Sequence, residues 1–382
     1  MIIKNLVIGF LLICLLGYSV ATNFSYTATT SLNGKILYVG GSGPNNYTSI
    51  QDAIDDANDG DTIFVYSGTY YENIVIYKEL TIKGEDKNTT IIDGKLSGTV
   101  VSIHYVNYVE LSGFTIKNGG DYVGVYLTNS RYCKIYDCKI TSSDHGMIIY
   151  ESSNNEITDC YFHNNYGHNL LITVSSNNNK VKDCVLSDAK WGGIYIYESN
   201  SNFIENCVSE NCATGFVIGW DSKDNSIINC SSSKHDYNGI FVYNADNTEI
   251  TNCHLFQNNV DGIRIRAASS NIKVEGCIIE NNWAGIEILQ ESSSIQIKNN
   301  NIVNNEIGVY VNGSKNSIRV NYNNIFGNNG KGVIATNDSI VDARNNYWGT
   351  FFGPITFGLL GDGVIPIGGK IYFFPWSFKP FS

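Results

Sequence analysis

The sequence predicts an all-β solenoid, a single-stranded parallel β-helix of about ten to twelve coils with a short N-terminal capping helix. Two columns of residues carry this prediction. A glycine followed by alternating apolar residues recurs about every 23 residues from Gly124 to Gly332, and a mainly cysteine column keeps the same spacing from Phe114 to Asn346. Internal repeats of this length indicate stacked units, none of which can bury its apolar face alone.

Each repeat contains two strand patterns separated by polar turns. Residues 194–197 alternate after Gly193, and a second short strand, such as 250–255, carries the cysteine column. Strict alternation is typical of a strand with one buried face. Pairs such as Asn258-Asn259 follow the second strand, and asparagine suits a sharp corner where its amides can stack into a ladder. A leucine-rich repeat has a similar length, but its leucine consensus is missing.

Seven cysteines occupy one position of successive repeats. Neighbouring coils lie about 4.8 Å apart, whereas a disulfide needs Cβ atoms about 3.5–4.5 Å apart. The column also continues as Asn300 and Asn323. We therefore expect a reduced packing ladder inside the stack. Cys133 and Cys212 fall outside this column, and we expect surface thiols or a disulfide there. The ladder comprises Cys138, Cys160, Cys184, Cys207, Cys230, Cys253 and Cys277.

The two ends of the chain lack the repeat. Lys4, the apolar run 6–16 and a small-residue site ending at Ala21 predict a signal peptide; the run is short for a membrane span, and an uncleaved anchor is the alternative. Thr48 with Gln51 predicts a capping box that starts the helix. The predicted organisation is signal peptide 1–21, linker 22–35, N-terminal cap and first coils 36–100, repeats 101–346 and C-terminal cap 347–382.

These segments resemble a known family. Residues 38–41, 47–54, 60–63 and 68–73 (Tyr-Val-Gly-Gly, Tyr-Thr-Ser-Ile-Gln-Asp-Ala-Ile, Gly-Asp-Thr-Ile and Gly-Thr-Tyr-Tyr-Glu-Asn) are similar to the N-terminal cap of pectate-lyase-like right-handed β-helix proteins. The repeats resemble the NosD-type parallel β-helix repeat, also described as a carbohydrate-binding and sugar-hydrolase domain. The ending, with Asn346-Tyr347-Trp348-Gly349, Gly361-Asp362-Gly363-Val364 and Pro375-Trp376, looks like the closing cap of archaeal and bacterial surface members.

The resemblance implies a right-handed β-helix in a secreted or cell-surface protein, and it leaves the function open. Lyases, hydrolases, adhesins and surface-layer proteins share this fold. The NosD name also implies copper handling, which favours His, Met and Cys ligands. After the signal region only Met147 remains, and His145 and His168 are the only histidines in register on neighbouring coils, so we expect no metal site.

Composition and the position of each residue within its repeat favour a binding surface. The chain has 25 Lys and Arg against 36 Asp and Glu, a net charge of −11, and it lacks the basic cluster that nucleic acid requires. Positions two and four after each glycine should face outward, where flat aromatic rings suit sugar stacking. Strand propensity alone could also place aromatic residues there. The predicted carbohydrate-binding residues are Tyr126, Tyr150, Tyr195, Tyr197, Trp220, Phe241, Tyr243, Arg264 and Arg266.

Two other functions remain open. A polysaccharide lyase or glycoside hydrolase would use Asp236, Asp261, Arg264 and Glu287, because carboxyl pairs about 5–9.5 Å apart cleave glycosidic bonds. A purely structural or adhesive envelope protein would need no such residues. We expect no cofactor, except calcium if the protein is a lyase. The expected partner is a polysaccharide or cell-envelope glycan, and the oligomeric state stays open.

Overall fold

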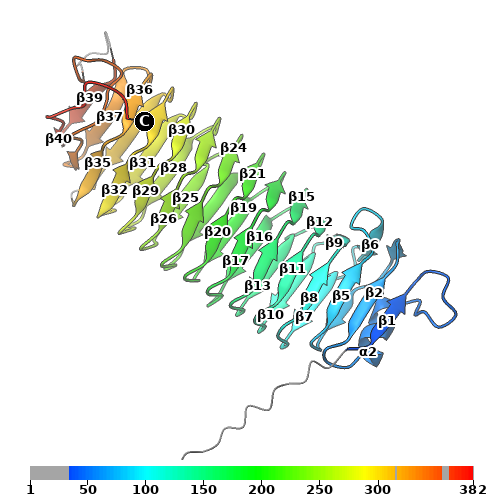
Figure 1. The fold of residues 1–382 in the computed structure, drawn as a ribbon. Helices are drawn as coiled ribbons and strands as arrows, with labels where there is room; N and C mark the ends of the chain where they lie inside the picture. Colours follow the sequence, from blue (N-terminus) through cyan, green and yellow to red (C-terminus); the bar gives the residue numbers. More distant parts are fainter. Residues whose placement is uncertain (1–33, 315, 355–360, 382) are drawn as a thin grey trace, which may run out of the picture. The chain divides into compact units, whose positions relative to one another are not determined.

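The computed structural model describes residues 34–314, 316–354 and 361–381 and confirms the parallel β-helix. Successive coils stack from β1 to β40, and every third strand pairs in parallel with its neighbour, so each regular coil contributes one strand to each of three sheets (Figure 1). The sheets hold 15, 13 and 12 strands, somewhat more coils than the sequence predicts. The signal peptide and most of the linker lie outside the described residues.

Sheet A contains 15 strands. They are β1 (Ile36–Val39), β2 (Thr62–Val65), β5 (Thr81–Gly84), β8 (Glu110–Ser112), β11 (Lys134–Tyr136), β14 (Glu156–Thr158), β17 (Lys180–Lys182), β20 (Phe203–Glu205), β23 (Ser226–Ile228), β26 (Glu249–Thr251), β29 (Lys273–Glu275), β32 (Ile295–Lys298), β35 (Ile318–Asn321), β38 (Ile340–Asp342) and β40 (Lys370–Tyr372).

Sheet B contains 12 strands. They are β3 (Gly68–Tyr70), β6 (Thr90–Asp93), β9 (Thr115–Gly120), β12 (Lys139–Ser143), β15 (Tyr161–His163), β18 (Val185–Ser187), β21 (Val208–Glu210), β24 (Ser231–Ser233), β27 (His254–Phe256), β30 (Ile278–Glu280), β33 (Asn301–Val303) and β36 (Asn324–Phe326).

Sheet C contains 13 strands and includes the strands that follow the glycine column. They are β4 (Ile74–Ile76), β7 (Val101–His104), β10 (Val125–Thr128), β13 (Met147–Tyr150), β16 (His168–Thr173), β19 (Gly192–Tyr197), β22 (Thr214–Gly219), β25 (Ile240–Tyr243), β28 (Asp261–Arg266), β31 (Ala284–Leu289), β34 (Ile307–Asn312), β37 (Lys331–Thr336) and β39 (Gly363–Ile367).

Each coil has three strands rather than the two predicted. The expected second strand divides into a sheet A strand and a sheet B strand, as β14 and β15 show. The residue between them adopts left-handed backbone, with φ of 53° at Asp159 and 52° at Asp183. Asp and Asn tolerate this conformation better than other side-chain-bearing residues, so the chain bends just before each cysteine.

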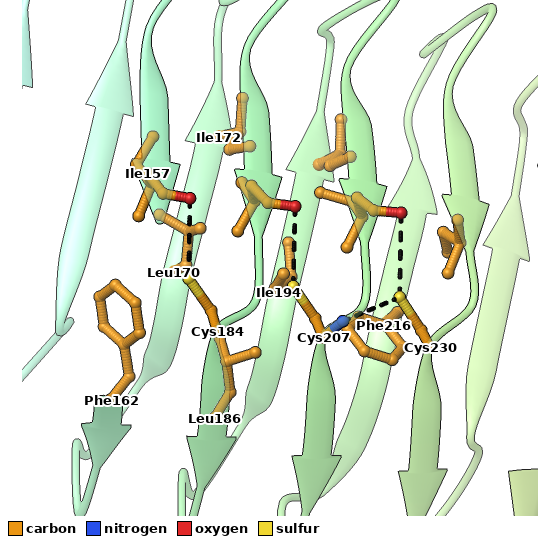
Figure 2. Packing of buried hydrophobic residues seen from close by; sticks show 14 of the residues in the cluster. Ile157, Phe162, Leu170, Ile172, Cys184, Leu186, Ile194, Cys207, Phe216 and Cys230 are labelled. Atoms are coloured by element: carbon orange, nitrogen blue, oxygen red, sulfur yellow. Dashed lines mark hydrogen bonds between the residues drawn. The ribbon is translucent and has the colours of Figure 1, made fainter. Parts of the chain in front are cut away.

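The cysteine column lies inside the stack, as predicted. Its members pack among isoleucine, leucine and phenylalanine side chains (Figure 2), and all nine cysteines of the described part are buried and free. The Cys207 amide donates to Cys230 Sγ at 3.4 Å, and the Cys277 amide donates to Asn300 Oδ1 at 2.8 Å. The column of hydrogen-bonded side chains thus continues from cysteine to asparagine without a break, which fits a packing role.

The expectation of surface or disulfide-bonded thiols at Cys133 and Cys212 is wrong. Both are buried because each occupies a place in another internal ladder. The Cys133 amide donates to Asn155 Oδ1 at 2.9 Å, and the Cys212 amide donates to His235 Nδ1 at 3.1 Å. His235 is itself fully buried. It does not lie on the surface, although its position in the sequence suggests a turn.

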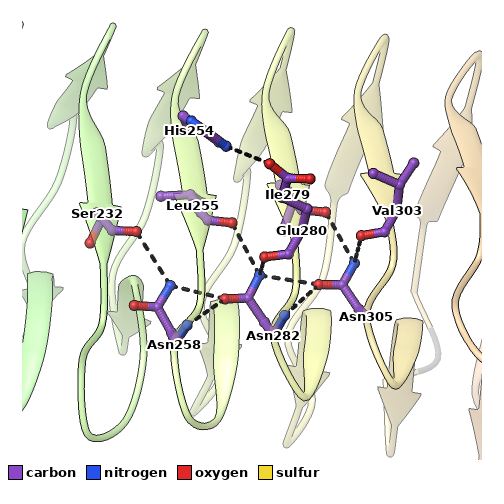
Figure 3. A network of polar contacts seen from close by, with 9 residues as sticks. All are labelled: Ser232, His254, Leu255, Asn258, Ile279, Glu280, Asn282, Val303 and Asn305. Atoms are coloured by element: carbon purple, nitrogen blue, oxygen red, sulfur yellow. Dashed lines mark hydrogen bonds and ion pairs between the residues drawn. The ribbon is translucent and has the colours of Figure 1, made fainter.

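An asparagine ladder forms the corner between sheets B and C (Figure 3). Asn258 donates from its backbone amide and from Nδ2 to Asn282 Oδ1, both at 3.0 Å. Asn282 repeats these contacts with Asn305 at 3.0 and 3.1 Å. Since each amide also binds a backbone carbonyl, such as that of Leu255 at 3.1 Å, the ladder satisfies groups that the bend would leave without partners.

Both ends of the stack are covered. Helix α2 (Ile50–Asp56) confirms the expected capping helix and buries Ile50, Ala53 and Ile54, but its N-cap is Ser49 rather than Thr48. The predicted capping box is wrong, because Gln51 Oε1 accepts from the Val75 amide, while Glu72 accepts from the Ile50 and Gln51 amides. At the other end the fully buried ring of Trp348 covers the last coils. Within the described ranges, no helix has the length and apolarity needed to cross a bilayer.

Candidate functional site

The outer face of sheet C carries the predicted binding residues. Alternation turns the second and fourth positions after each glycine outward, and most of these side chains are half-buried against one another. Tyr126 lies on β10, Tyr150 on β13, Tyr195 and Tyr197 on β19, Phe241 and Tyr243 on β25, and Arg264 and Arg266 on β28. Trp220 directly follows β22 and is 45% exposed.

The aromatic residues form two patches rather than one strip. In the register of sheet C, Tyr126 pairs with Ile148, which pairs with Leu171, which pairs with Tyr195. Two aliphatic side chains therefore separate Tyr126 from Tyr195 in this column. We call the second group, comprising Tyr195, Tyr197, Trp220, Phe241, Tyr243 and Arg266, the central patch.

Ring contacts connect the central patch. Trp220 packs against Tyr197 at 5.8 Å and against Tyr243 at 5.4 Å between ring centroids, and its Nε1 donates to Tyr195 Oη at 3.1 Å. The Arg266 guanidinium lies 5.2 Å from the Phe241 centroid and 5.0 Å from that of Tyr243. Such contacts hold aromatic rings in fixed positions, so the patch is a preformed surface.

Two histidines border the central patch. The His168 ring stacks on Tyr195 at 4.8 Å with an interplanar angle of 6°, and on His145 at 5.5 Å. The His168 backbone amide donates to His145 Nδ1 at 2.9 Å. Burial, together with the positive charge that His145 would carry when protonated, lowers the pKa of His168 to about 3, and burial also lowers the pKa of His145. These rings are therefore neutral aromatic surface at physiological pH.

Three charged residues lie beside the central patch on β28 and β31; we call Asp261, Arg264 and Glu287 the charged trio. Arg264 Nε donates to Asp261 Oδ2 at 2.8 Å and lies 2.6 Å from Glu287 Oε2. The side chain of Asp261 is fully buried and that of Glu287 is 6% exposed. The structure thus brings together three of the four residues proposed for catalysis.

The protonation of the charged trio follows from its burial. Asp261 Oδ1 is buried and has no hydrogen-bond partner in the described part of the chain, and the buried Glu287 Oε2 forms an ion pair with Arg264 Nε without accepting its hydrogen. Burial and the negative charge of Glu287 raise the pKa of Asp261 and Arg264 lowers it, and together these effects bring it to about 7. A proton on one carboxyl would relieve the repulsion between them.

Asp236 does not join the charged trio. It is exposed on the turn before β25, and its backbone amide donates to the Cys212 carbonyl at 3.0 Å. Sequence reasoning also did not anticipate an outward apolar cluster of Ala284, Ile307 and Ile334 beside Tyr310. The apolar residues Ile307 and Ile334 at outward positions were the available signal.

Comparisons with known proteins identify the family. The family model described as "Periplasmic copper-binding protein (NosD)" matches residues 54–231, 107–276 and 218–348. A "Cell surface glycoprotein" of Methanothermus fervidus is 37% identical over 91 residues, which are 23% of this chain. The chain spans only 15% of the length of that relative.

Solved structures share the fold at low identity. The mannuronan C-5 epimerase AlgE6 A-module of Azotobacter vinelandii has a TM-score of 0.60 at 13% identity, covering 84% of this chain and 93% of its own. A mannuronic acid specific family 6 lyase from human gut microbiota has a TM-score of 0.57 at 12% identity, covering 85% and 88%. The surface adhesin PfbA of Streptococcus pneumoniae has 0.55 at 14%, covering 73% and 88%.

The described residues do not offer the set of donor atoms that the copper of the family description would need. Copper favours His, Met and Cys ligands. Met147 and all nine described cysteines are buried in the core. The described ranges contain no group of three or more His, Cys, Asp or Glu that could hold a metal ion.

Proposed function

We propose that this chain, which belongs to the NosD family, is an exported β-helix protein of the cell surface that binds carbohydrate through the central patch. The supporting observation is the connected group of rings from His168 to Arg266, held in place on one face of a rigid sheet. Preformed aromatic surfaces lose little conformational entropy on binding and suit the apolar faces of sugar rings.

The known relatives support the same proposal. The curated relative is a cell surface glycoprotein, and the similar structures include an epimerase and a lyase named for mannuronan or mannuronic acid and a surface adhesin. Secretion through the predicted signal peptide, or anchoring by an uncleaved 1–21 segment, would place this chain where such ligands occur.

A glycan array with the mature protein tests the proposal. We expect binding to at least one glycan, weakened about tenfold or more by the triple substitution Tyr195→Ala, Trp220→Ala and Tyr243→Ala, because buried aromatic anchors dominate such contacts. The matched control is Tyr108→Ala with Tyr132→Ala. These rings also stack, at 5.3 Å, and are exposed, but they lie at the turns that lead into sheet A. Equal loss in both variants, or no glycan binding at all, would refute the proposal.

The charged trio favours a second candidate function, cleavage of a bound polysaccharide. An acid whose pKa lies near 7 can donate a proton at neutral pH, and Asp261 fits this description. Because both carboxyls approach the same Arg264 nitrogen, they leave no room for the water of an inverting hydrolase, whose carboxyls are roughly 6.5–9.5 Å apart. A lyase or a retaining hydrolase is the candidate reaction, with calcium as the expected cofactor of a lyase.

Product release separates this candidate from simple binding. Asp261→Asn should abolish release of reducing or unsaturated ends while glycan binding persists, because the amide keeps the shape of the carboxyl. Asp236→Asn, on the exposed turn, is the control that should leave release unchanged. If the wild-type protein binds glycans and releases no product from them, the cleavage candidate fails. A purely structural or adhesive envelope role is the reading that remains if the chain neither binds nor cleaves.

A further inference from the structure

A second set of aromatic side chains follows the corner between sheets B and C; we call Trp191, Tyr237 and Trp283 the corner row. Trp191 directly precedes β19 and Trp283 directly precedes β31, while Tyr237 lies on the turn before β25. Their side chains are 50%, 58% and 41% exposed. These residues do not belong to the central patch, whose side chains project from the sheet itself.

The corner row places one large ring on every second coil. Backbone hydrogen bonds connect the coils at this corner: the Tyr237 amide donates to the Ala213 carbonyl at 2.8 Å, the Val260 amide to the Tyr237 carbonyl at 2.9 Å, and the Trp283 amide to the Val260 carbonyl at 2.7 Å. Ala213 and Val260 thus occupy the intervening coils. With neighbouring coils about 4.8 Å apart, the backbone positions that carry the rings repeat about every 10 Å.

Trp191 is held in place before any ligand arrives. Its ring packs edge-on against His145 at 5.9 Å and against His168 at 5.5 Å, with interplanar angles of 68° and 70°. Burial lowers the pKa of both histidines, so this support does not change its charge near neutral pH. A side chain that is already ordered costs less entropy on binding.

The charges along this corner favour an uncharged ligand. Asp144, Asp236 and Glu306 follow the same turns, where their backbone amides bond to the preceding coil. The Lys331 ammonium lies 2.5 Å from a Glu306 oxygen, so it is already paired. The Lys190 ammonium lies 4.5 Å from the Tyr166 centroid. A polymer of uronic acids would bring further negative charge beside Asp144 and Asp236, which opposes association, and it would find Lys331 already paired with Glu306.

We propose that the corner row binds an extended, uncharged β-1,4-linked polysaccharide that runs across successive coils. Successive sugars of such a chain alternate in orientation, so every second sugar presents the same face, at a repeat close to the spacing of two coils. Helical β-1,3-linked chains and flexible α-1,6-linked chains do not maintain this repeat. The proposal rests on the proposed function only for the ligand class, because the corner row consists of other residues, although Trp191 contacts His168 at the border of the central patch.

Calorimetric titration with soluble oligosaccharides tests the assignment. The probes are cello- and chito-oligosaccharides from disaccharide to hexasaccharide. Affinity should increase with length until the ligand spans the three rings, about 19 Å over four coil steps, and then level off. Each of Trp191→Ala, Tyr237→Ala and Trp283→Ala should weaken hexasaccharide binding about tenfold, in the range of single aromatic anchors. Unchanged thermal unfolding of each variant checks that the exposed substitution leaves the fold intact.

Three controls make the result decisive. Laminari-oligosaccharides change the linkage, oligomannuronates add charge to the same β-1,4 linkage, and the pair Tyr108→Ala and Tyr132→Ala removes exposed rings elsewhere. Equal affinity for either control ligand, or full affinity in a variant lacking all three corner rings, would overturn the inference. If the central patch variant loses binding and the corner variant keeps it, the inference falls while the proposed function stands. If the wild-type protein binds no glycan, both fall.

Discussion

Replacing Asp261 with asparagine should remove a pH dependence from the stability of the fold. Asp261 is fully buried beside Glu287, and its pKa is raised from 3.8 to about 7. Between these values the folded protein holds a proton that the unfolded chain has released. The free energy of unfolding must therefore decrease as the pH increases from about 4 to about 7.

The size of this effect follows from the interval between the two pKa values. At 1.36 kcal/mol per pKa unit, the rise to about 7 corresponds to about 4 kcal/mol of stability lost across this range. The asparagine amide resembles the protonated carboxyl and leaves Arg264 paired with Glu287. We therefore expect Asp261→Asn to match the wild type near pH 4 and to exceed it by up to about 4 kcal/mol at pH 8.

Urea unfolding between pH 4 and pH 8 measures this difference. Other carboxyls, such as the buried Asp362, titrate in both proteins, so the quantity of interest is the wild type minus the variant. Asp236→Asn, on the exposed turn, controls for the loss of one acidic residue. A difference that stays constant across the pH range, or that is largest at low pH, would refute the assignment of a shared proton to the charged trio.

Three further predictions concern the ladders and the histidines. Asn305→Ala should lower the free energy of unfolding by about 2–4 kcal/mol, measured by urea unfolding, because Asn305 Nδ2 binds the Ile279 and Val303 carbonyls and its loss leaves buried groups unpaired; exposed Asn259→Ala is the control. A thiol reagent should leave the nine described cysteines unmodified in the folded protein and modify all of them in denaturant, because all are buried. Burial also raises the pKa of Cys133 and Cys212 to about 11, which keeps these two thiols protonated and unreactive. His168 should not make glycan affinity depend on pH between pH 5 and pH 8, because its pKa of about 3 keeps it neutral. A change in affinity with a midpoint near pH 6 that disappears in His168→Asn would contradict this.

The repeat itself made most of the fold predictable. A period of about 23 residues, strict alternation and an internal cysteine column specify which side chains face inward, because a one-residue slip would expose the core. The third strand of each coil was missed since a bend of one residue, such as Asp159, interrupts a run that otherwise reads as continuous. The internal positions of Cys212 and His235 were missed because both residues replace asparagine in its ladder. Their residue types alone do not indicate that position.

The site was less predictable, because its features depend on neighbours in adjacent coils. Alternation placed Arg264 and Glu287 on the outer face, but only the register of β28 against β31 shows that they pair. The position of Asp261 before its glycine suggested an exposed turn, whereas the strand begins at this residue. Interruption of the aromatic column by Ile148 could have been read from its second position after Gly146, and the register of β13 against β16 confirms it by pairing Ile148 with Leu171.

The charged trio is informative because it does not make the fold more stable than uncharged residues would. Equivalent positions on neighbouring coils hold uncharged residues: Ala284 pairs with Asp261, Phe241 with Arg264 and Tyr310 with Glu287. A coil with those residues would complete the same sheet without burying charge, and buried ion pairs are often no more stabilising than well-packed apolar residues. The two coils that contribute the charged trio therefore bury charge where the flanking coils hold Phe241 and Tyr310. Because the trio lies beside the aromatic rings of the central patch, Asp261→Asn is to be tested for glycan binding and product release as well as for stability.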